Sequence, residues 1–209
     1  MRRSFRARPT AVRCSGPGAA APVAMSSTDE IPIPCRTLIE VAEMLRSRTI
    51  TSLELTETML SHIAQHEPTL HAFCCLTPEI ARAEARAADA EIEAAGTTKG
   101  PMHGVPIAVK DLYAVAGVQN AAGSKALMDQ IPQSDCTVVE KFRAAGAVIL
   151  GKLNTTEGAM GGYNEHLEHN IPRNPWNLDR WAGASSSVSS SSSRRSSNSR
   201  ACHAALPRA

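Results

Sequence analysis

The first regular pattern of apolar and polar positions begins at Thr37. Leu38, Val41 and Leu45 recur at intervals of three and four residues, which places their side chains on one face of a helix. Thr37 and Glu40 have the spacing of a capping box, in which each side chain accepts a hydrogen bond from the other residue's backbone amide. The pattern therefore predicts an amphipathic helix that begins directly after Thr37.

Two further helices are predicted before residue 100. Thr51 and Glu54 repeat the capping-box spacing, and Pro68 is expected to follow the end of this second helix. Pro78 suits the first turn of a third helix, where its missing amide hydrogen costs nothing. This helix is expected to stop at Gly96, because glycine readily adopts the left-handed backbone that ends many helices.

Two continuous apolar runs predict buried strands. They cover Val105 to Val109 and Ala147 to Leu150, and a helix that Asp135 can cap separates them. Strand, helix and strand in this order are typical of an α/β sheet, in which sites collect beyond the carboxyl ends of the strands. Lys110 and Asn154 both stand at such ends, so this edge of the sheet is the predicted functional site.

The composition of the 209 residues is that of a globular protein, with 43% hydrophobic and 20% charged side chains. A net charge of +2 gives no general attraction to polyanions, so a nucleic-acid partner is not expected. No apolar run approaches the roughly eighteen residues that a membrane span needs. The six cysteines form no Cys-x-x-Cys pair and no zinc-like spacing, so no metal site is expected. The sequence leaves open whether the protein forms a homodimer.

Residues 1–28 differ from the rest of the chain. They contain five arginines and no acidic residue before Thr28, which is the composition of an organelle transit peptide. An alternative is that translation begins at Met25 and the upstream stretch is an extension of the gene model. The first interpretation predicts a mitochondrial or plastid protein and the second a cytoplasmic one. Neither places this segment in the core.

Lys110 follows the first buried strand directly, and Asp111 comes next. Because successive strand side chains point to opposite faces, the two cannot occupy the same space. We expect Lys110 to point inward and Asp111 to lie near the surface. Burial disfavours the charged form of a lysine, and a neutral amine can act as a base. The alternative is a lysine whose stem packs on apolar surface while its amine reaches water.

Several ordered motifs resemble those of the amidase signature family. The motifs are Gly104-Val-Pro-Ile-Ala-Val-Lys-Asp-Leu112, Gly123-Ser124-Lys125, Gly146-Ala-Val-Ile-Leu-Gly-Lys-Leu-Asn154, Glu157 with Gly161-Gly162, Asn174-Pro175-Trp176 and Gly183-Ala-Ser-Ser-Ser187. The resemblance extends over residues 37–187. It implies the N-terminal part of the amidase signature fold, an α/β fold with a mixed β-sheet core covered by helices, truncated in this chain.

The resemblance also implies roles for individual residues. Lys110 would be the base. Ser185 would relay a proton to Lys110 from a second, nucleophilic serine, which this chain lacks. Ser186 and Ser187 are adjacent alternatives for the relay. Met160 and Gly161 would line the cleft for a small-molecule amide substrate, and no cofactor or metal would be needed. From the residues alone, the segment at Met160 is equally well a connecting turn, and the serine run a flexible loop.

The resemblance stops after Ser187. Val188 stands where the family has glycine, and residues 188–209 form a tail rich in serine and arginine. We expect that this tail is not the native continuation of the domain, which sequencing of the full transcript would test. An alternative is a disordered segment that binds RNA. The chain as written is expected to have negligible amidase activity, and the rival interpretation is a non-catalytic fragment.

Overall fold

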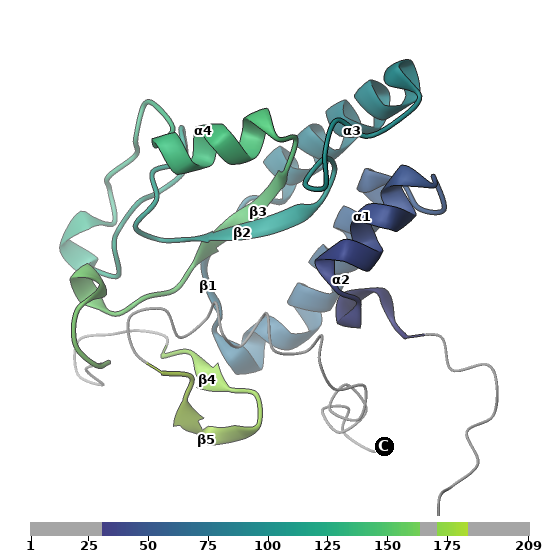
Figure 1. Cartoon of the computed structure of the whole chain (residues 1–209). Helices are drawn as coiled ribbons and strands as arrows, with labels where there is room; N and C mark the ends of the chain where they lie inside the picture. Colours follow the sequence, from purple (N-terminus) through teal and green to yellow (C-terminus); the bar gives the residue numbers. More distant parts are fainter. Residues whose placement is uncertain (1–30, 164–170, 184–209) are drawn as a thin grey trace, which may run out of the picture. The chain divides into compact units, whose positions relative to one another are not determined.

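The computed structural model describes residues 31–163 and 171–183. Figure 1 shows a mixed sheet with helices on both of its faces. The helices are α1 (Leu38–Arg46), α2 (Ser52–Leu70), α3 (Pro78–Ala95) and α4 (Thr137–Ala144), and the strands are β1 (Phe73–Leu76), β2 (Pro106–Lys110), β3 (Val148–Leu153), β4 (Arg173–Asn174) and β5 (Asn177–Trp181). The predicted α/β architecture, a sheet core covered by helices, is confirmed.

The sheet that carries the predicted site contains strands β1, β3 and β2 in that order. Strand β2 runs parallel to β3, whereas β1 runs antiparallel to it. All six residues of β3 are buried, because this central strand is covered on both faces. Strands β4 and β5 form a separate antiparallel hairpin.

Three clusters of buried apolar side chains fill the spaces between these layers. One joins α1 and α2 to the start of β2, and a second joins α2 and α3 to β3. The third lies between the sheet and α4 and continues into the loop after β2. Its members are Val109, Val115, Val118, Val139 and Ile149. The core therefore holds both faces of β3 and fixes the strand ends where the site was predicted.

The two predicted capping boxes are present. The Thr37 hydroxyl accepts a hydrogen bond from the Glu40 amide at 3.2 Å, and the Thr51 hydroxyl accepts one from the Glu54 amide at 3.1 Å. The expected end of α2 before Pro68 is wrong, since the helix continues to Leu70. A proline in the last turn removes only one helical hydrogen bond, and the helix still closes through the bond from the His71 amide to the Glu67 carbonyl.

The predicted cap of α4 is also wrong. Cys136 occupies the N-cap position and makes no side-chain cap bond. Asp135 instead accepts a hydrogen bond from the Ala116 amide at 2.7 Å and one from Arg143 at 2.6 Å. Asp135 therefore ties α4 to the loop after β2, and a partner distant in sequence has replaced the local cap. The predicted stop of α3 at Gly96 is confirmed, with a left-handed backbone at φ 75°.

Strand β3 contains a bulge that changes which face its later side chains occupy. Ile107 pairs with Ile149, but Ala108 pairs with Gly151, so Leu150 is an extra residue. Because side chains alternate, one extra residue turns every later side chain to the other face. Lys152 consequently pairs with Val109 and shares its face, toward α4. A side chain at Gly151 would overlap the Cys75 carbonyl oxygen of β1.

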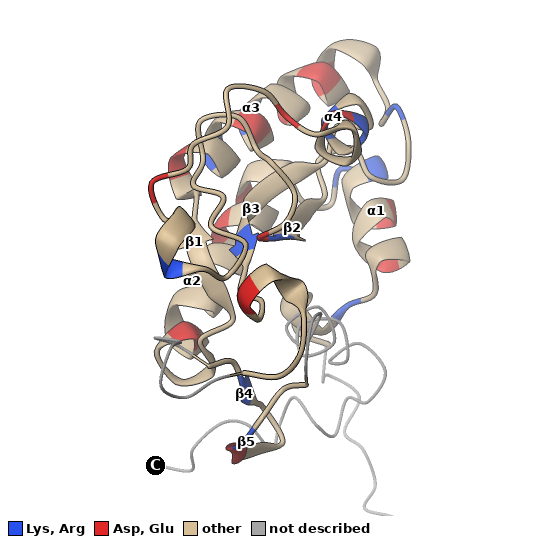
Figure 2. Ribbon diagram, turned by 90° about the vertical axis from the view of Figure 1, so that its left-hand side faces the viewer, with Lys and Arg blue, Asp and Glu red and all other residues tan. Residues whose placement is uncertain are grey.

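Residues of both charge signs occur along α1 and α3 (Figure 2). Arg46 and Glu43 pair on α1 at 2.6 Å, and Arg82 of α3 pairs with Glu57 of α2 at 2.7 Å. Within residues 31–163 and 171–183, no helix is both long and apolar enough to cross a membrane.

The buried face of α1 should dominate its contribution to stability. Leu45 is 1% exposed and packs in the core, whereas Ile39 on the same helix is 79% exposed. Truncation of Leu45 to alanine should lower the free energy of unfolding by about 2–5 kcal/mol, because it removes packed atoms and leaves a cavity. The matched variant Ile39→Ala should change it by less than about 0.5 kcal/mol. Urea unfolding of both variants, followed by circular dichroism, checks this; equal losses would contradict the packing of α1.

His103 should make stability depend on pH. Its ring is 2% exposed, accepts a hydrogen bond from the Lys99 amide and lies 3.1 Å from Glu91. Burial, with the Lys99 charge adding, lowers the pKa of His103 despite Glu91. Below about pH 6.5 the unfolded chain then binds a proton that the folded chain does not, so stability falls as pH falls.

The measurement is the difference in unfolding free energy between pH 7.5 and pH 5.5. His103→Gln should reduce that difference, because glutamine does not titrate. The same pH difference in the variant and the wild type would show that His103 does not control it.

Candidate active site

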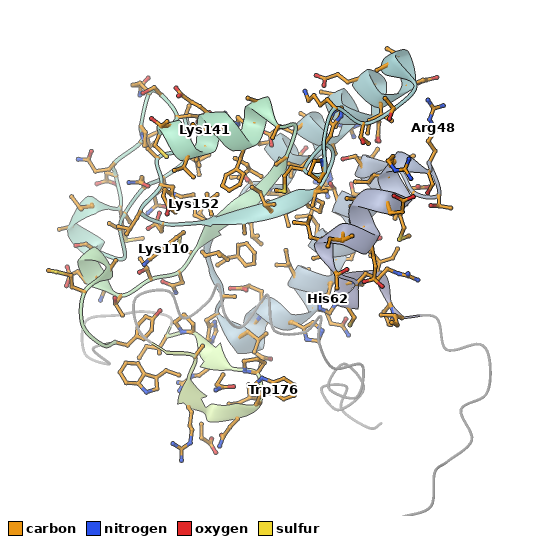
Figure 3. All side chains as sticks on the ribbon, in the orientation of Figure 1. Arg48, His62, Lys110, Lys141, Lys152 and Trp176 are labelled. Carbon is orange, nitrogen blue, oxygen red and sulfur yellow. The ribbon has the colours of Figure 1, made fainter. Side chains whose placement is uncertain are left out.

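The carboxyl ends of β2 and β3 meet at one edge of the sheet, because the two strands are parallel. Lys110, the last residue of β2, pairs with Leu153, the last residue of β3, and is half-buried. Figure 3 labels Lys110 and Lys152 close to this edge. The sequence therefore predicted the location of Lys110 and the shared edge correctly.

Asp111 lies in the interior, and its expected place near the surface is wrong. The residue is 1% exposed. Its amide donates to the Leu153 carbonyl at 3.0 Å, and its carbonyl accepts from the Ala122 amide at 3.1 Å. Its carboxylate accepts from the Lys152 amine at 2.9 Å and from the Gly123 amide at 3.3 Å. The strand ends at Lys110, so the alternation rule no longer governs the direction of the next side chain.

Lys152 is a site residue that sequence reasoning missed. Its side chain is 0% exposed and pairs with Asp111. The amine also donates to the Asn120 side-chain oxygen at 2.8 Å and to the Gln119 carbonyl at 3.2 Å. Three acceptors match the three protons of an ammonium group, so every donor of the Lys152 amine has a partner. The signal in the sequence was a single lysine inside the apolar run of β3.

The loop after residue 119 packs closely on the chain that leaves β3. Gly123 has φ 74°, and a Cβ atom there would lie 2.6 Å from the Thr155 carbonyl oxygen and 2.7 Å from that of Thr156. The next residue, Ser124, is buried and donates its hydroxyl hydrogen to Glu157 at 2.7 Å. Only glycine fits at residue 123, because the backbone is left-handed and a second backbone lies directly against it.

Asn154 does not start a helix, although Asn154 and Glu157 have the spacing from which a helix cap at Asn154 is predicted. The short 3-10 helix Glu157–Ala159 has Thr156 at its N-cap position, with no side-chain cap bond. The Asn154 side chain accepts a hydrogen bond from the Thr155 amide at 2.9 Å, and the Asn154 amide itself donates to the Ala72 carbonyl. Asn154 therefore shapes the turn that leaves β3 instead of starting a helix.

The two residues expected to bind substrate follow this short helix. Met160 is 78% exposed, and Gly161 has φ 71° with no atom within 4 Å of a Cβ position. The next residues contact the hairpin: a Cβ at Gly162 would meet the Trp181 ring, and the Tyr163 and Trp181 rings lie 5.7 Å apart. Trp176 at the hairpin turn is 59% exposed (Figure 3). Ser185 and the tail from residue 188 lie outside the described residues.

Among residues 31–163 and 171–183, no three histidine, cysteine or acidic side chains converge as metal ligands would. The chemistry that the edge of the sheet offers is that of amines, hydroxyls and carboxylates. Lys110 supplies an amine at the strand end, the Asp111–Lys152 pair lies buried beside it, and Ser124 bonds Glu157 across the loop.

The fold and this edge define an α/β protein whose candidate site lies at the ends of parallel strands and contains a lysine. The family model described as Amidase matches residues 54–192, so the chain belongs to the amidase signature family. This finding confirms the resemblance drawn from the motifs around Lys110.

Named relatives match about three quarters of the chain. The Mycobacterium bovis protein AmiD is 48% identical over 159 residues, which cover 76% of this chain and 33% of AmiD. A glutamyl-tRNA(Gln) amidotransferase subunit from Pseudomonas fluorescens is 45% identical over 150 residues, 72% of this chain and 31% of that protein. The X-ray structure of the native peptide amidase from Stenotrophomonas maltophilia matches with 31% identity and a TM-score of 0.67, over 77% of this chain and 34% of that one. The chain thus spans about a third of the length of these relatives.

The close approach at Gly123 should be detectable as a loss of stability. Gly123→Ala places a methyl group against two carbonyl oxygens and also strains a left-handed backbone. Gly117→Ala is the matched control, because Gly117 has φ 72° but open space around its Cβ position. The control should lose about 1–2 kcal/mol from backbone strain alone, and Gly123→Ala about 1–3 kcal/mol more from overpacking. Urea unfolding measures both; equal losses would show that the loop does not press on Thr155 and Thr156.

Proposed function

We propose that the protein represented by this chain hydrolyses carboxylic amides, with Lys110 as the general base. Membership of the amidase signature family supports the reaction class, which is cleavage of a C–N bond. The observation that carries the assignment of the base is the position of Lys110, half-buried at the carboxyl end of β2, where α/β sheets collect their sites.

The geometry distinguishes between the two lysines at this edge. Lys152 is fully buried, and its three protons are all donated to oxygen atoms, so it has no lone pair with which to take a proton. Lys110 is half-buried and does not belong to the buried Asp111–Lys152 pair. Lys110 is therefore the better candidate for a base.

The proposed reaction moves one proton along a chain of hydroxyls. The neutral amine of Lys110 takes the proton of Ser185, and Ser185 takes that of the nucleophilic serine as its oxygen attacks the amide carbonyl carbon. The C–N bond breaks, the leaving nitrogen receives the proton back through Ser185, and an acyl ester remains on the nucleophile. Water then attacks the ester and loses its proton along the same route. As the C–O bond to the nucleophile breaks, the proton returns through Ser185 to the nucleophile's oxygen, and the carboxylic acid leaves. Met160 and Gly161 would contact the substrate beside this route.

We also propose that the 209 residues by themselves have negligible amidase activity. The resemblance to the amidase signature family implies a nucleophile within a Gly-Gly-Ser motif, and this motif does not occur after Ser187. Without that serine the covalent route has no first step. A non-catalytic fragment is the second candidate function, and the shortness of the match, about a third of each relative, favours it for the chain alone.

These two proposals have separate tests. The purified chain should release no ammonia above background from a panel of primary carboxylic amides. A chimera in which residues 37–183 replace the matching segment of AmiD should release ammonia. Lys110→Ala in that chimera should lower kcat/KM by about 10²- to 10⁴-fold, the usual contribution of a general base.

Lys141→Ala is the control, since Lys141 is exposed on α4 and should change kcat/KM less than about twofold. Full activity in the Lys110→Ala chimera would refute the assignment of the base. Hydrolysis by the unmodified chain that depends on Lys110 would refute its inactivity.

A further inference from the structure

Burial of the Asp111–Lys152 pair costs hydration free energy, and a contribution to stability does not by itself explain why the pair is there. Both side chains are almost fully removed from water, at 2% and 0% exposure. Buried ion pairs lose so much hydration that apolar replacements of similar size are often equally stable or more so. The pair makes every hydrogen bond that the lysine amine can donate. We therefore look for the role of the pair in the geometry that its hydrogen bonds impose.

That geometry is the attachment of one loop to two strand ends. Lys152 on β3 bonds the Gln119 carbonyl and the Asn120 side chain. Asp111, directly after β2, bonds the amides of Ala122 and Gly123 through its carbonyl and carboxylate. Residues 119–123 are thus held from both sides by the two charged groups.

The same loop continues to the segment expected to bind substrate. Ser124 bonds Glu157 at 2.7 Å, and the Gly158 amide donates to the Ala122 carbonyl at 2.8 Å. Met160 and Gly161 follow within three residues of Gly158. A displacement of the loop would therefore move Lys110's neighbour Asp111 and this segment together.

The two charged residues are also close to Lys110 along the strands. Asp111 follows Lys110 in the chain, and Lys152 precedes Leu153, the partner of Lys110 on β3. Together they are neutral, but either one alone would bias the protonation of Lys110, in opposite directions. From β1, the Cys74 thiol interacts with both charges, and desolvation raises its pKa to about 12, so it adds no charge near pH 8. Burial raises the pKa of Cys75 as well.

We propose that Asp111 and Lys152 are positioning residues for Lys110: as a buried pair without net charge, they hold loop 119–124 and the adjoining strand ends in place beside that residue. The proposal rests on the proposed role of Lys110 as the base.

The test uses the full chain and three variants: Asp111→Asn, Lys152→Met and the double variant. The first readout is competitive acetylation, in which mass spectrometry compares the reactivity of Lys110 with that of the exposed Lys141 at pH 8. The second readout is hydrogen exchange of the amides in residues 119–124, with α2 as the internal reference. Neither readout requires hydrolysis of an amide, so a negative ammonia assay and a failure of this proposal are separate results.

The two single variants should shift the relative reactivity of Lys110 in opposite directions. Lys152→Met leaves a carboxylate that favours the protonated, unreactive amine, so reactivity should fall by about threefold. Asp111→Asn leaves the Lys152 ammonium, which disfavours the protonated form of Lys110, so the reactivity of Lys110 should rise by about threefold. A purely structural role would loosen the site in both variants and move the reactivity in the same direction.

The double variant is neutral and should fold, with Lys110 reactivity within about twofold of wild type. Its loop amides should nevertheless exchange at least about tenfold faster, because methionine cannot bond Gln119 or Asn120. If the single variants fail to fold, the double variant decides. Unchanged exchange in the double variant, single variants that shift alike, or failure of all three to fold would each overturn the proposal.

Discussion

A carboxylate and an ammonium buried together at the ends of two parallel strands are the constraint on which this site depends. Asp111 and Lys152 are 41 residues apart in the chain, yet their side chains lie 2.9 Å from one another in the interior. An unpaired charge in that position would be very unfavourable, so each residue requires the other. Their remaining bonds determine where the loop 119–123 runs and how it meets the chain that leaves β3.

The bulge in β3 is what makes this pairing available. Without the extra residue at Leu150, alternation would turn Lys152 toward α2 and α3 and their apolar cluster, away from Asp111. Gly151 permits the bulge because β1 passes too close for a side chain. The same edge then holds two lysines in different environments, one enclosed by oxygen atoms and one half-buried at the strand end. This difference, and not the residue type, is the ground on which we propose a positioning role for Lys152 and the role of base for Lys110.

Local patterns predicted much of the fold and failed where another hydrogen-bond partner, near or distant in the sequence, competed. The capping boxes at Thr37 and Thr51 formed because both members lie within one turn of the same helix. Asp135 and Asn154 had equally good local spacing but bond elsewhere, Asp135 to Ala116 and Arg143 and Asn154 within its own turn. An aspartate or asparagine side chain bonds the best partner available in the folded chain. Sequence spacing does not reveal which partners folding brings near.

The sequence by itself determined the α/β class, the strand that ends at Lys110, and the motifs that place the chain in the amidase signature family. The fold class and the strand follow from the periodicity of apolar residues, and the family follows from short motifs. Both signals involve residues that are close together in the sequence. Only the tertiary structure decided that Asp111 is buried, that Lys152 is its partner, and that Gly123 lies against Thr155 and Thr156. The physical reason is that burial and charge pairing depend on which distant segments meet, and the bulge at Leu150 changes that outcome by a single residue.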